Sequence, residues 1–268
     1  ILNTVVNPFF SELVSSLELA AYDRGYLTLL ATAQNDPVRQ RELLHSMVSQ
    51  GVAGVIVSPV HETVPDLLTA TLNRGIPTVV CVRDIPGSKA VFVGVDEELS
   101  GYLAARHLIK FGHREFTFIG GYERTTTWRG RQAGMKRALS EAGLPQDGLT
   151  LVPGPLLPEF AYQTLCSLKT DRPKAVLCFN DDQAGGAYRA ARAQGVQVGR
   201  DLSVLGFDNI PQAETLWPPL TSVDIHPKKI GSIAATKVAE MLSGGRVEAP
   251  SELLKPELVE RDSVARIA

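Results

Sequence analysis

Residues 50–57 read QGVAGVIV, in which Gly51 ends an apolar helical pattern and the β-branched run Val55-Ile56-Val57 follows. The same order recurs along the chain at Arg24-Gly25, Arg74-Gly75, Phe111-Gly112, Gly143 and Gln194-Gly195. Glycine has no Cβ, so it accepts the left-handed backbone that ends a helix. The recurrence predicts helices alternating with strands, which is typical of parallel sheets covered by helices on both faces.

The apolar runs give about nine candidate strands, which favours two open sheets over one because a single core stops growing near about 250–300 residues. The candidates include Tyr26–Leu30, Gly54–Val57, Ile76–Val80, Val91–Val95, Phe116–Ile119, Val176–Phe179 and Ser203–Gly206. The chain contains no Gly/Ser-rich linker. We therefore expect short crossings between the two halves, the first near Val95-Asp96-Glu97.

Helix starts agree with this alternation. Asp36-Pro37 places a capping carboxylate before a proline at the first helical position, and Asp181 or Asp182 is predicted to cap the helix toward Ala193. The acidic triplet Asp96-Glu97-Glu98 fits a helix N-terminus better than a cation site.

Composition and charge exclude several classes of protein. The 268 residues are 44% hydrophobic with a net charge of −2, and no apolar run reaches the length of a membrane span. Charges of both signs are mixed along the chain, whereas a DNA-binding module has a basic stripe or cluster, so little affinity for nucleic acid is expected from these residues alone. Three cysteines, Cys81, Cys166 and Cys178, lie in or beside apolar runs and predict buried free thiols.

The amino end shows no basic stretch ahead of an apolar one, as a signal peptide would. The chain begins at Ile1 inside a predicted strand, which we interpret as a fragment of a longer protein; a processed terminus is the alternative. We expect a cytoplasmic protein that does not bind membranes.

Ligands of open α/β sheets bind outside the carboxyl ends of the strands, so the side chains that follow each strand matter. These positions carry Asn, Arg and Asp among aromatic residues: Asn7, Phe9, Phe10, Arg83, Asp84, Arg124, Trp128, Arg131, Asn180, Asp181, Phe207 and Asp208. Such groups bind hydroxyls while a ring covers an apolar sugar face. Any one of them alone is better explained as a loop residue or a cap, and for Asp181 and Asp182 capping is favoured.

Signatures of catalysis are missing from the sequence. It contains no phosphate-binding GxxxxGK[ST], no strand-borne GxGxxG and no GxSxG. The five histidines have no HExxH or CxxC partners, and His113, just after Gly112, is expected to meet the last helical carbonyls. We therefore predict no enzyme, no cofactor and no metal.

Several segments, in order, resemble the LacI/GalR family of bacterial transcription regulators over essentially the whole chain. They are residues 7–10 (NPFF), 107–113 (HLIKFGH), 131–134 (RQAG), 179–181 (FND), 202–208 (LSVLGFD), 219–223 (PLTSV), 230–234 (IGSIA) and 254–263 (LKPELVERDS). Each segment is weak by itself, but the ordered set is specific.

The resemblance implies an α/β fold of the type I periplasmic-binding-protein kind, in which two Rossmann-like lobes with parallel sheets are joined by three crossings. The amino-terminal lobe would comprise residues 1–96 and 225–252, and the carboxy-terminal lobe 97–224 and 253–268. The family's helix-turn-helix headpiece does not lie within these residues. The resemblance further implies a homodimer that controls transcription, binding operator DNA only through that headpiece, with a small-molecule effector in the cleft between the lobes.

Carried over by position, the family's effector contacts fall on Phe9 or Phe10, Arg131, Asn180 and Asp208, with Thr127 and Leu156 at more variable pocket positions. The family often has an Asp-Arg pair after the fourth strand, whereas this chain has Val82-Arg83. The missing carboxylate and the apolar Leu156 depart from a fully sugar-like pocket and indicate an effector less hydroxylated than a hexose, or one bound partly by stacking on Trp128. A sugar is still the first expectation, with a purine or nucleoside second.

Two rivals remain. A periplasmic sugar-binding protein for transport shares the fold and the cleft, but it would carry a leader peptide. A doubly wound enzyme would need a catalytic base near a nucleophile, or a phosphate loop.

Overall fold

The computed structural model describes residues 1–168, 174–244 and 251–267. The chain forms two compact units. Unit 1 consists of Ile1–Val95, Arg124–Thr127 and His226–Leu254, and unit 2 of Asp96–Glu123, Trp128–Ile225 and Lys255–Ala268.

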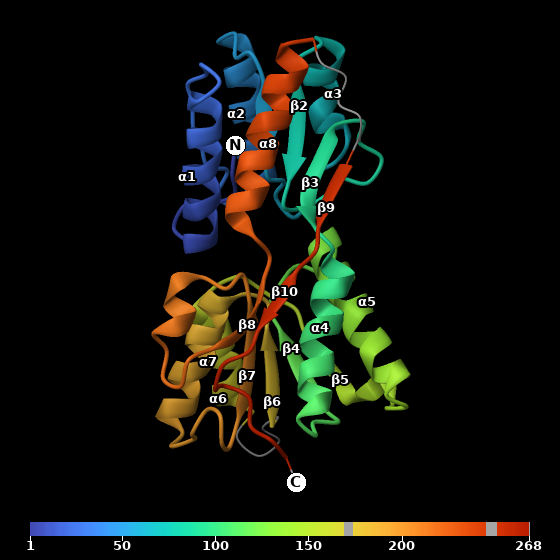
Figure 1. Ribbon diagram of the computed structural model, residues 1–268, viewed down its shortest axis with the longest axis vertical. Helices are drawn as coiled ribbons and strands as arrows, with labels where there is room; N and C mark the ends of the chain where they lie inside the picture. Colours follow the sequence, from blue (N-terminus) through green and yellow to red (C-terminus); the bar gives the residue numbers. More distant parts are fainter. Residues whose placement is uncertain (169–173, 245–250, 268) are drawn as a thin grey trace. The chain divides into compact units, whose positions relative to one another are not determined.

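Unit 1 is built around a parallel sheet with the strand order β1-β2-β3-β9, of which Figure 1 labels β2, β3 and β9. Its elements are α1 (Pro8–Tyr22), α2 (Pro37–Ser49), β1 (Val55–Val57), α3 (Asp66–Asn73), β2 (Thr78–Cys81), β3 (Val91–Val95), α8 (Pro227–Leu242) and β9 (Ser251–Leu254). Leu44 and Met47 of α2 and Leu67 and Leu68 of α3 form one core cluster with the sheet. Helix α8 packs against β1, β2 and β3, and α1 lies beside α8 (Figure 1).

The amino end continues this sheet beyond β1. The Ile1 amino group donates to Ile56 O at 2.7 Å, and Leu2 N donates to Ala31 O at 2.9 Å. The strand predicted at Tyr26–Leu30 is wrong, because only an isolated bridge between Leu2 and Thr32 forms in this region. Leu27 is 91% exposed, so the apolar run there does not enter the core.

Unit 2 has a sheet with the order β10-β8-β7-β6-β4-β5 (Figure 1), in which all neighbours are parallel except β10, which is antiparallel to β8. Its elements are α4 (Glu97–Lys110), β4 (Phe116–Ile119), α5 (Thr126–Glu141, beginning in the segment grouped with unit 1), the 3₁₀ turn η1 (Gln146–Gly148), β5 (Leu149–Val152), α6 (Pro158–Ser167), β6 (Ala175–Cys178), α7 (Asp181–Ala193), β7 (Ser203–Phe207), the 3₁₀ turn η2 (Pro211–Glu214), β8 (Thr221–Asp224) and β10 (Glu257–Val259).

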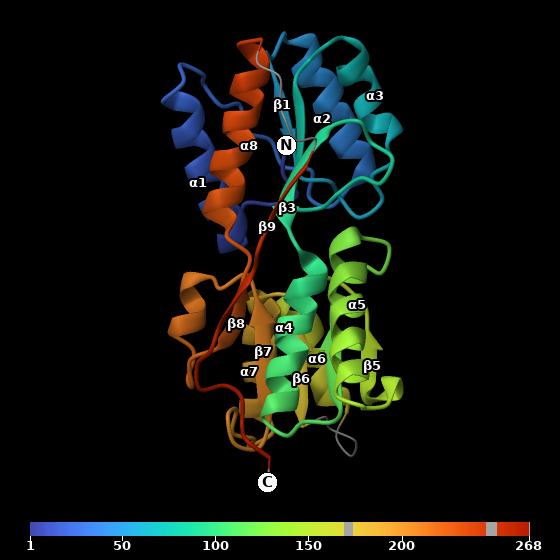
Figure 2. The same ribbon diagram turned by 45° about the vertical axis from the view of Figure 1, so that its right-hand side comes forward.

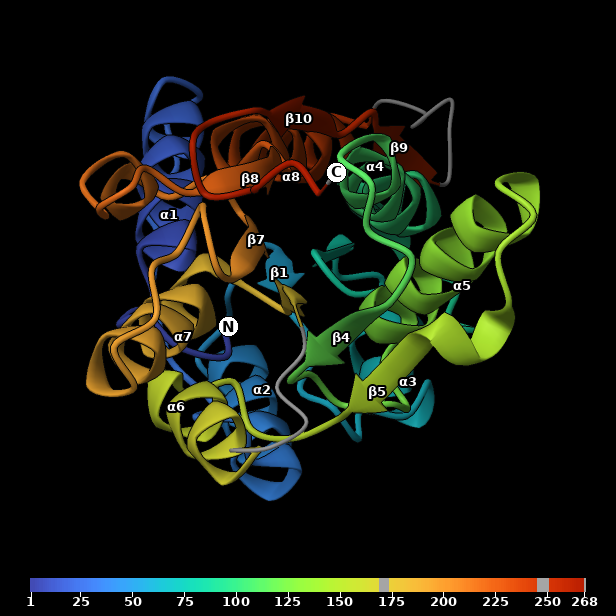
Figure 3. The ribbon, with the colours of Figure 1, turned by 90° about the horizontal axis from the view of Figure 1, so that it is seen from below.

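Helices cover the sheet of unit 2 as the alternation predicts. Helices α6 and α7 lie side by side (Figure 3), and their small apolar residues form one core cluster with β6 and β7. Helix α4 packs against β8 and β10 and runs next to α5 (Figure 2). The approach of α4 to α5 is close enough to require glycine, since a Cβ at Gly101 would lie 2.0 Å from Arg131 O.

The expected glycine caps are confirmed. The six glycines at the predicted helix ends all have positive φ: Gly25, Gly51, Gly75, Gly112, Gly143 and Gly195. The caps at Asp36, which accepts from Val38 N, and at Asp96, which accepts from Leu99 N, are also confirmed. His113 meets a helical carbonyl as expected, because its N–H donates to Leu108 O of α4 at 3.1 Å, and its ring Nε2 lies 2.8 Å from Ser203 Oγ and 3.1 Å from Ala265 O.

The three cysteines are free, with Cys81 and Cys178 buried and Cys166 half-buried. Burial raises the pKa of the Cys81 thiol to about 12. Over the described ranges no helix is long and apolar enough to span a bilayer.

Candidate functional site

The carboxyl ends of β4, β6 and β7 in unit 2 gather aromatic rings around one arginine. Phe118 of β4 lies 6.1 Å from Phe179, 6.2 Å from Trp128 and 6.5 Å from Phe207, measured between ring centroids. Phe179 directly follows β6, Phe207 ends β7, and Trp128 lies in the first turn of α5. Four buried rings from four elements therefore meet at one edge of the sheet, where ligands of such sheets bind.

Arg131 of α5 lies among these rings and is 1% exposed. Its guanidinium carbon is 4.2 Å from the ring centre of Phe207 and 4.7 Å from that of Phe179. Its Nε donates to Glu97 Oε2 at 2.7 Å, and one terminal nitrogen donates to Phe179 O at 2.5 Å. Cation–π contacts and a paired carboxylate compensate the cost of burying this charge. The guanidinium is thus fixed before any ligand arrives.

Asp208 comes directly after β7 and is buried, with 7% of its surface exposed. Its backbone is left-handed, with φ of 103°, and its N–H donates to Val223 O at 2.9 Å. Burial, followed by the nearby Asp181 carboxylate, raises the pKa of Asp208 well above its ordinary value, while Arg131 acts in the opposite direction. Burial thus disfavours the charged form of this carboxyl group, and a donor from a bound ligand would favour it.

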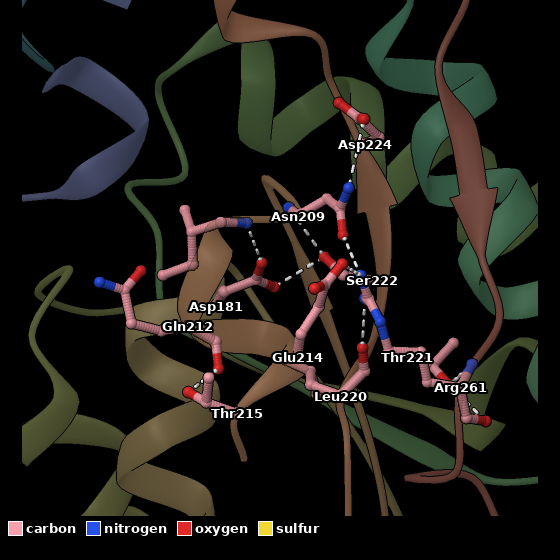
Figure 4. Close-up of polar contacts among 11 residues, drawn as sticks. Asp181, Asn209, Gln212, Glu214, Thr215, Leu220, Thr221, Ser222, Asp224 and Arg261 are labelled. Atoms are coloured by element: carbon pink, nitrogen blue, oxygen red, sulfur yellow. Dashed lines mark hydrogen bonds and ion pairs between the residues drawn. The ribbon is translucent and has the colours of Figure 1, made fainter. Parts of the chain in front are cut away.

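Asn180 is the N-cap of α7, because its Oδ1 accepts from Gln183 N at 2.9 Å. The prediction that Asp181 or Asp182 caps this helix is therefore wrong. Asp181 instead accepts from Ser222 Oγ at 2.7 Å and from Ile210 N at 2.9 Å (Figure 4). Burial raises the pKa of Asp181 to about 7, while these hydrogen bonds act in the opposite direction.

In unit 1, three of the predicted site residues have local roles at the start of α1. Asn7 is the N-cap, with Oδ1 accepting from Phe9 N at 2.8 Å. Phe9 and Phe10 are both buried, and their rings meet edge to face at 5.1 Å. The segment predicted to contact effector is therefore also the segment that starts this helix.

Arg83 stands on a strained turn of unit 1. Its N–H donates to Cys81 O at 2.8 Å across Val82, whose φ of 70° is unusual for a β-branched residue. The Arg83 side chain is 6% exposed and donates to Pro59 O at 3.3 Å. Such strain persists only where the surroundings hold it, and it is common at functional sites.

Thr127 groups with unit 1 and is 3% exposed, and its hydroxyl has no partner among the described residues. Leu156 lies in unit 2, half-buried in the loop after β5. The predicted site residues therefore comprise a connected group around Arg131 in unit 2, Leu156 on a loop of the same unit, and a second set in unit 1.

Two polar residues of unit 1 were missed by the sequence reasoning. Asn3 and Ser58 are 7% and 1% exposed, and Asn3 Oδ1 and Ser58 Oγ have no hydrogen-bond partner among the described residues. Both follow the apolar run of a strand, Ile1-Leu2 and Val55–Val57, which is the signal that could have identified them. Within the described ranges no group of three His, Cys, Asp or Glu side chains could hold a metal.

Comparisons with known proteins agree with this architecture. Residues 105–264 match the family model of a periplasmic binding protein-like domain. The HTH-type transcriptional repressor PurR of Erwinia tasmaniensis is 34% identical over 265 residues, which is 96% of this chain and 76% of that protein. The chain belongs to the LacI family of transcriptional regulators.

Solved LacI-family structures confirm the expected fold. A regulator from Enterococcus faecium, determined with bound ribose, superimposes with a TM-score of 0.89 at 26% identity and covers 100% of this chain and 98% of that one. A putative ribose operon repressor from Burkholderia thailandensis gives 0.84 at 30% identity, covering 96% of each chain. The chain is thus a LacI-family effector-binding core of the type I periplasmic-binding-protein fold, and the matched relatives are regulators and repressors.

Proposed function

We propose that this chain is the ligand-sensing and dimerisation core of a transcriptional regulator, and that its effector is a sugar. The effector contacts the carboxyl ends of the unit 2 strands through Trp128, Arg131, Asn180, Phe207 and Asp208. Asn7, Phe9, Phe10, Arg83 and Thr127 of unit 1 complete the binding site in the cleft that the family resemblance implies, and Leu156 lines a more variable position. Binding changes how the full-length protein holds operator DNA.

The arrangement of Arg131 and Asp208 is the observation that supports this proposal most. Three hydrogen bonds to described residues use three of the five N–H donors of Arg131, and two remain for an effector. Asp208, which interacts electrostatically with Arg131, supplies a buried acceptor. A fixed donor pair and a carboxylate among aromatic faces suit a ligand with several hydroxyls and an apolar face.

Two relatives favour a sugar, since one is determined with ribose and another is a putative ribose operon repressor. The second candidate is a purine or nucleoside. The cluster of Phe118, Trp128, Phe179 and Phe207 favours it, because aromatic rings stack on planar bases. The 34% identity to a PurR repressor points the same way.

Thermal unfolding against sugars, sugar phosphates, polyols, purines and nucleosides tests the proposal. A ligand at about 100 times its dissociation constant adds about 2.7 kcal/mol, which raises the melting temperature by several degrees at about 2–4 °C per kcal/mol. A shift with ribose that Asp208→Asn removes supports the sugar site. A shift only with nucleosides moves the assignment to the second candidate, and turnover of any ligand contradicts the whole proposal.

Regulation requires a pair of these chains. We expect a homodimer acting in the cytoplasm, with operator contact made through the family's headpiece and not through residues 1–268. Sedimentation at micromolar concentration tests the dimer. A gel shift of operator DNA by these residues alone, weakened by salt, would contradict the assignment of DNA binding to the headpiece.

A further inference from the structure

The loop that carries Asp208 has a backbone that non-glycine residues seldom adopt. Asp208 and Asn209 follow each other with φ of 103° and 53°. Two successive positive φ values persist only when neighbouring groups hold them. Asp181, Ser222 and Arg261, from three other segments of unit 2, hold the loop through Asn209 and the residue after it (Figure 4).

Asp181 holds the backbone of the loop. Its Oδ2 accepts directly from Ile210 N at 2.9 Å. Its Oδ1 accepts from Ser222 Oγ at 2.7 Å, and Ser222 Oγ accepts in turn from Asn209 N at 3.1 Å. One buried carboxylate therefore fixes the two amides that follow Asp208. A Cβ at Gly206 would lie 2.0 Å from this carboxylate, so the glycine in β7 makes room for it.

Arg261 holds the side chain of the same loop. One terminal nitrogen donates to Asn209 Oδ1 at 2.9 Å and to Glu214 Oε1 at 3.2 Å, and the other donates to Leu220 O at 2.8 Å. Asn209 also donates through Nδ2 to Asp224 Oδ2 at 3.3 Å. The planar guanidinium makes these bonds with a fixed geometry that a flexible ammonium cannot reproduce.

Arg261 is itself well anchored. Its N–H donates to Thr221 Oγ1 at 2.9 Å, and the Thr221 hydroxyl donates to Arg261 O at 3.1 Å. Its side chain is only 12% exposed. Arg261 follows β10, and only Lys255-Pro256 separate β10 from β9 of unit 1. Arg261, which binds the loop, therefore lies on the segment that enters unit 2 from the last strand of unit 1.

We propose that Arg261 and Asp181 are positioning residues for effector binding, which together hold the Asp208-Asn209-Ile210 loop in the conformation that presents the Asp208 carboxylate. The proposal rests on the proposed function, since it concerns the same site. Neither residue contacts the effector. Arg261 thereby links this loop to the segment that follows β9 and β10.

Amide hydrogen exchange tests the hold on the loop without any ligand. We expect Arg261→Met and Asp181→Asn to speed exchange of the Asn209 and Ile210 amides at least tenfold, with β6 and α5 unchanged. Asparagine keeps one acceptor oxygen for Ile210 N but can only donate to Ser222 Oγ, so the second bond is reversed and both bonds lose the negative charge of the carboxylate. Arg189→Met is the matched control, because Arg189 is an exposed arginine of unit 2 paired with Glu159.

A double-mutant cycle of ligand binding then tests whether Arg261 affects affinity through Asp208. Titration calorimetry with D-ribose and with adenosine compares wild type, Arg261→Met, Asp208→Asn and the double variant. We expect Arg261→Met to weaken binding at least tenfold alone but less than twofold in the Asp208→Asn background. Arg261→Lys, which keeps the charge but not the fork, should weaken binding nearly as much.

Equal losses in both backgrounds would overturn the positioning role, as would loop exchange unchanged from wild type in both variants. If neither probe binds wild type, the sugar and nucleoside assignments of the proposed function fail. The exchange measurement still decides the role of Arg261 and Asp181 in that case. If Arg261→Met does not fold, Arg261→Lys provides both readouts.

Discussion

The contacts that hold the predicted site residues differ between the two units. In unit 2, Arg131 contacts Phe179 and Phe207 and is paired with Glu97, so each residue of the cluster is held by another. In unit 1, Asn7 caps α1 and Phe9 packs on Phe10, so the same residues have roles that need no ligand. The difference teaches that unit 2 carries a preorganised charged site, while unit 1 supplies residues whose first role is to build the fold.

Arg131→Met should produce the largest effect. It leaves the Glu97 carboxylate, whose side chain is 11% exposed, without its cation, and breaking a buried pair costs about 3–5 kcal/mol. The measurement is denaturant unfolding alongside effector titration. Adding Glu97→Gln should recover part of the stability but none of the affinity. Recovery of both the stability and the affinity would show that Arg131 serves only the ion pair. The residues of unit 2, like those of unit 1, would then have a structural role first.

Asp208→Asn should separate stability from binding. Effector affinity should fall by about 2–3 kcal/mol, since a charged acceptor is lost in a dry site. The free protein should become more stable, because burial disfavours the charged form of Asp208, as its raised pKa shows, and the amide removes that cost. Glu159→Gln, at an exposed carboxylate paired with Arg189, is the control and should change neither. A loss of stability without a loss of affinity would make Asp208 a structural residue.

The alternation of helices and strands was predictable from sequence because it depends on local signals. Each helix-ending glycine was recognised from its neighbours, and each has positive φ. The strand predicted at Tyr26–Leu30 does not form, because an apolar run becomes a strand only when a partner strand lies beside it. Here the pairing is limited to one bridge at Thr32. Pairing partners cannot be deduced from the run itself.

The site was predictable where a residue follows a strand, and not where its role depends on distant contacts. Arg131 and Asp208 were found from strand ends and from the resemblance. Asp181 was misassigned as a cap because the partner that takes its carboxylate, Ser222, lies 41 residues away. Arg261 was only part of a family segment, since its grip on Asn209, across 52 residues, has no local signal.

Stability should fall as pH rises through the range in which Asp181 titrates. Its pKa is about 7 in the folded protein and near its ordinary value when unfolded. The folded state therefore keeps a proton that the unfolded state has lost, and this advantage disappears as pH passes about 7, by about 1 kcal/mol between pH 6 and 8. Thermal melts of wild type and Asp181→Asn measure it as a difference, so that the lowered pKa values of His107 and His113 cancel. Parallel pH profiles would contradict the assignment.

The smallest effects should come from Asn7, where the contrast between the units can be sharpened. Asn7→Ala should cost about 1 kcal/mol of stability, and Asn7→Gly only a few tenths, because these are the values of an N-cap. Asn7→Asp keeps the cap acceptor but replaces the amide donor with a carboxylate oxygen. If Asn7 only caps α1, Asn7→Asp should keep both the stability and the effector affinity that Asn7→Ala loses. If its amide also donates to the effector, Asn7→Asp restores stability while affinity stays low, and unit 1 then contributes a ligand contact from the same residue that starts its first helix.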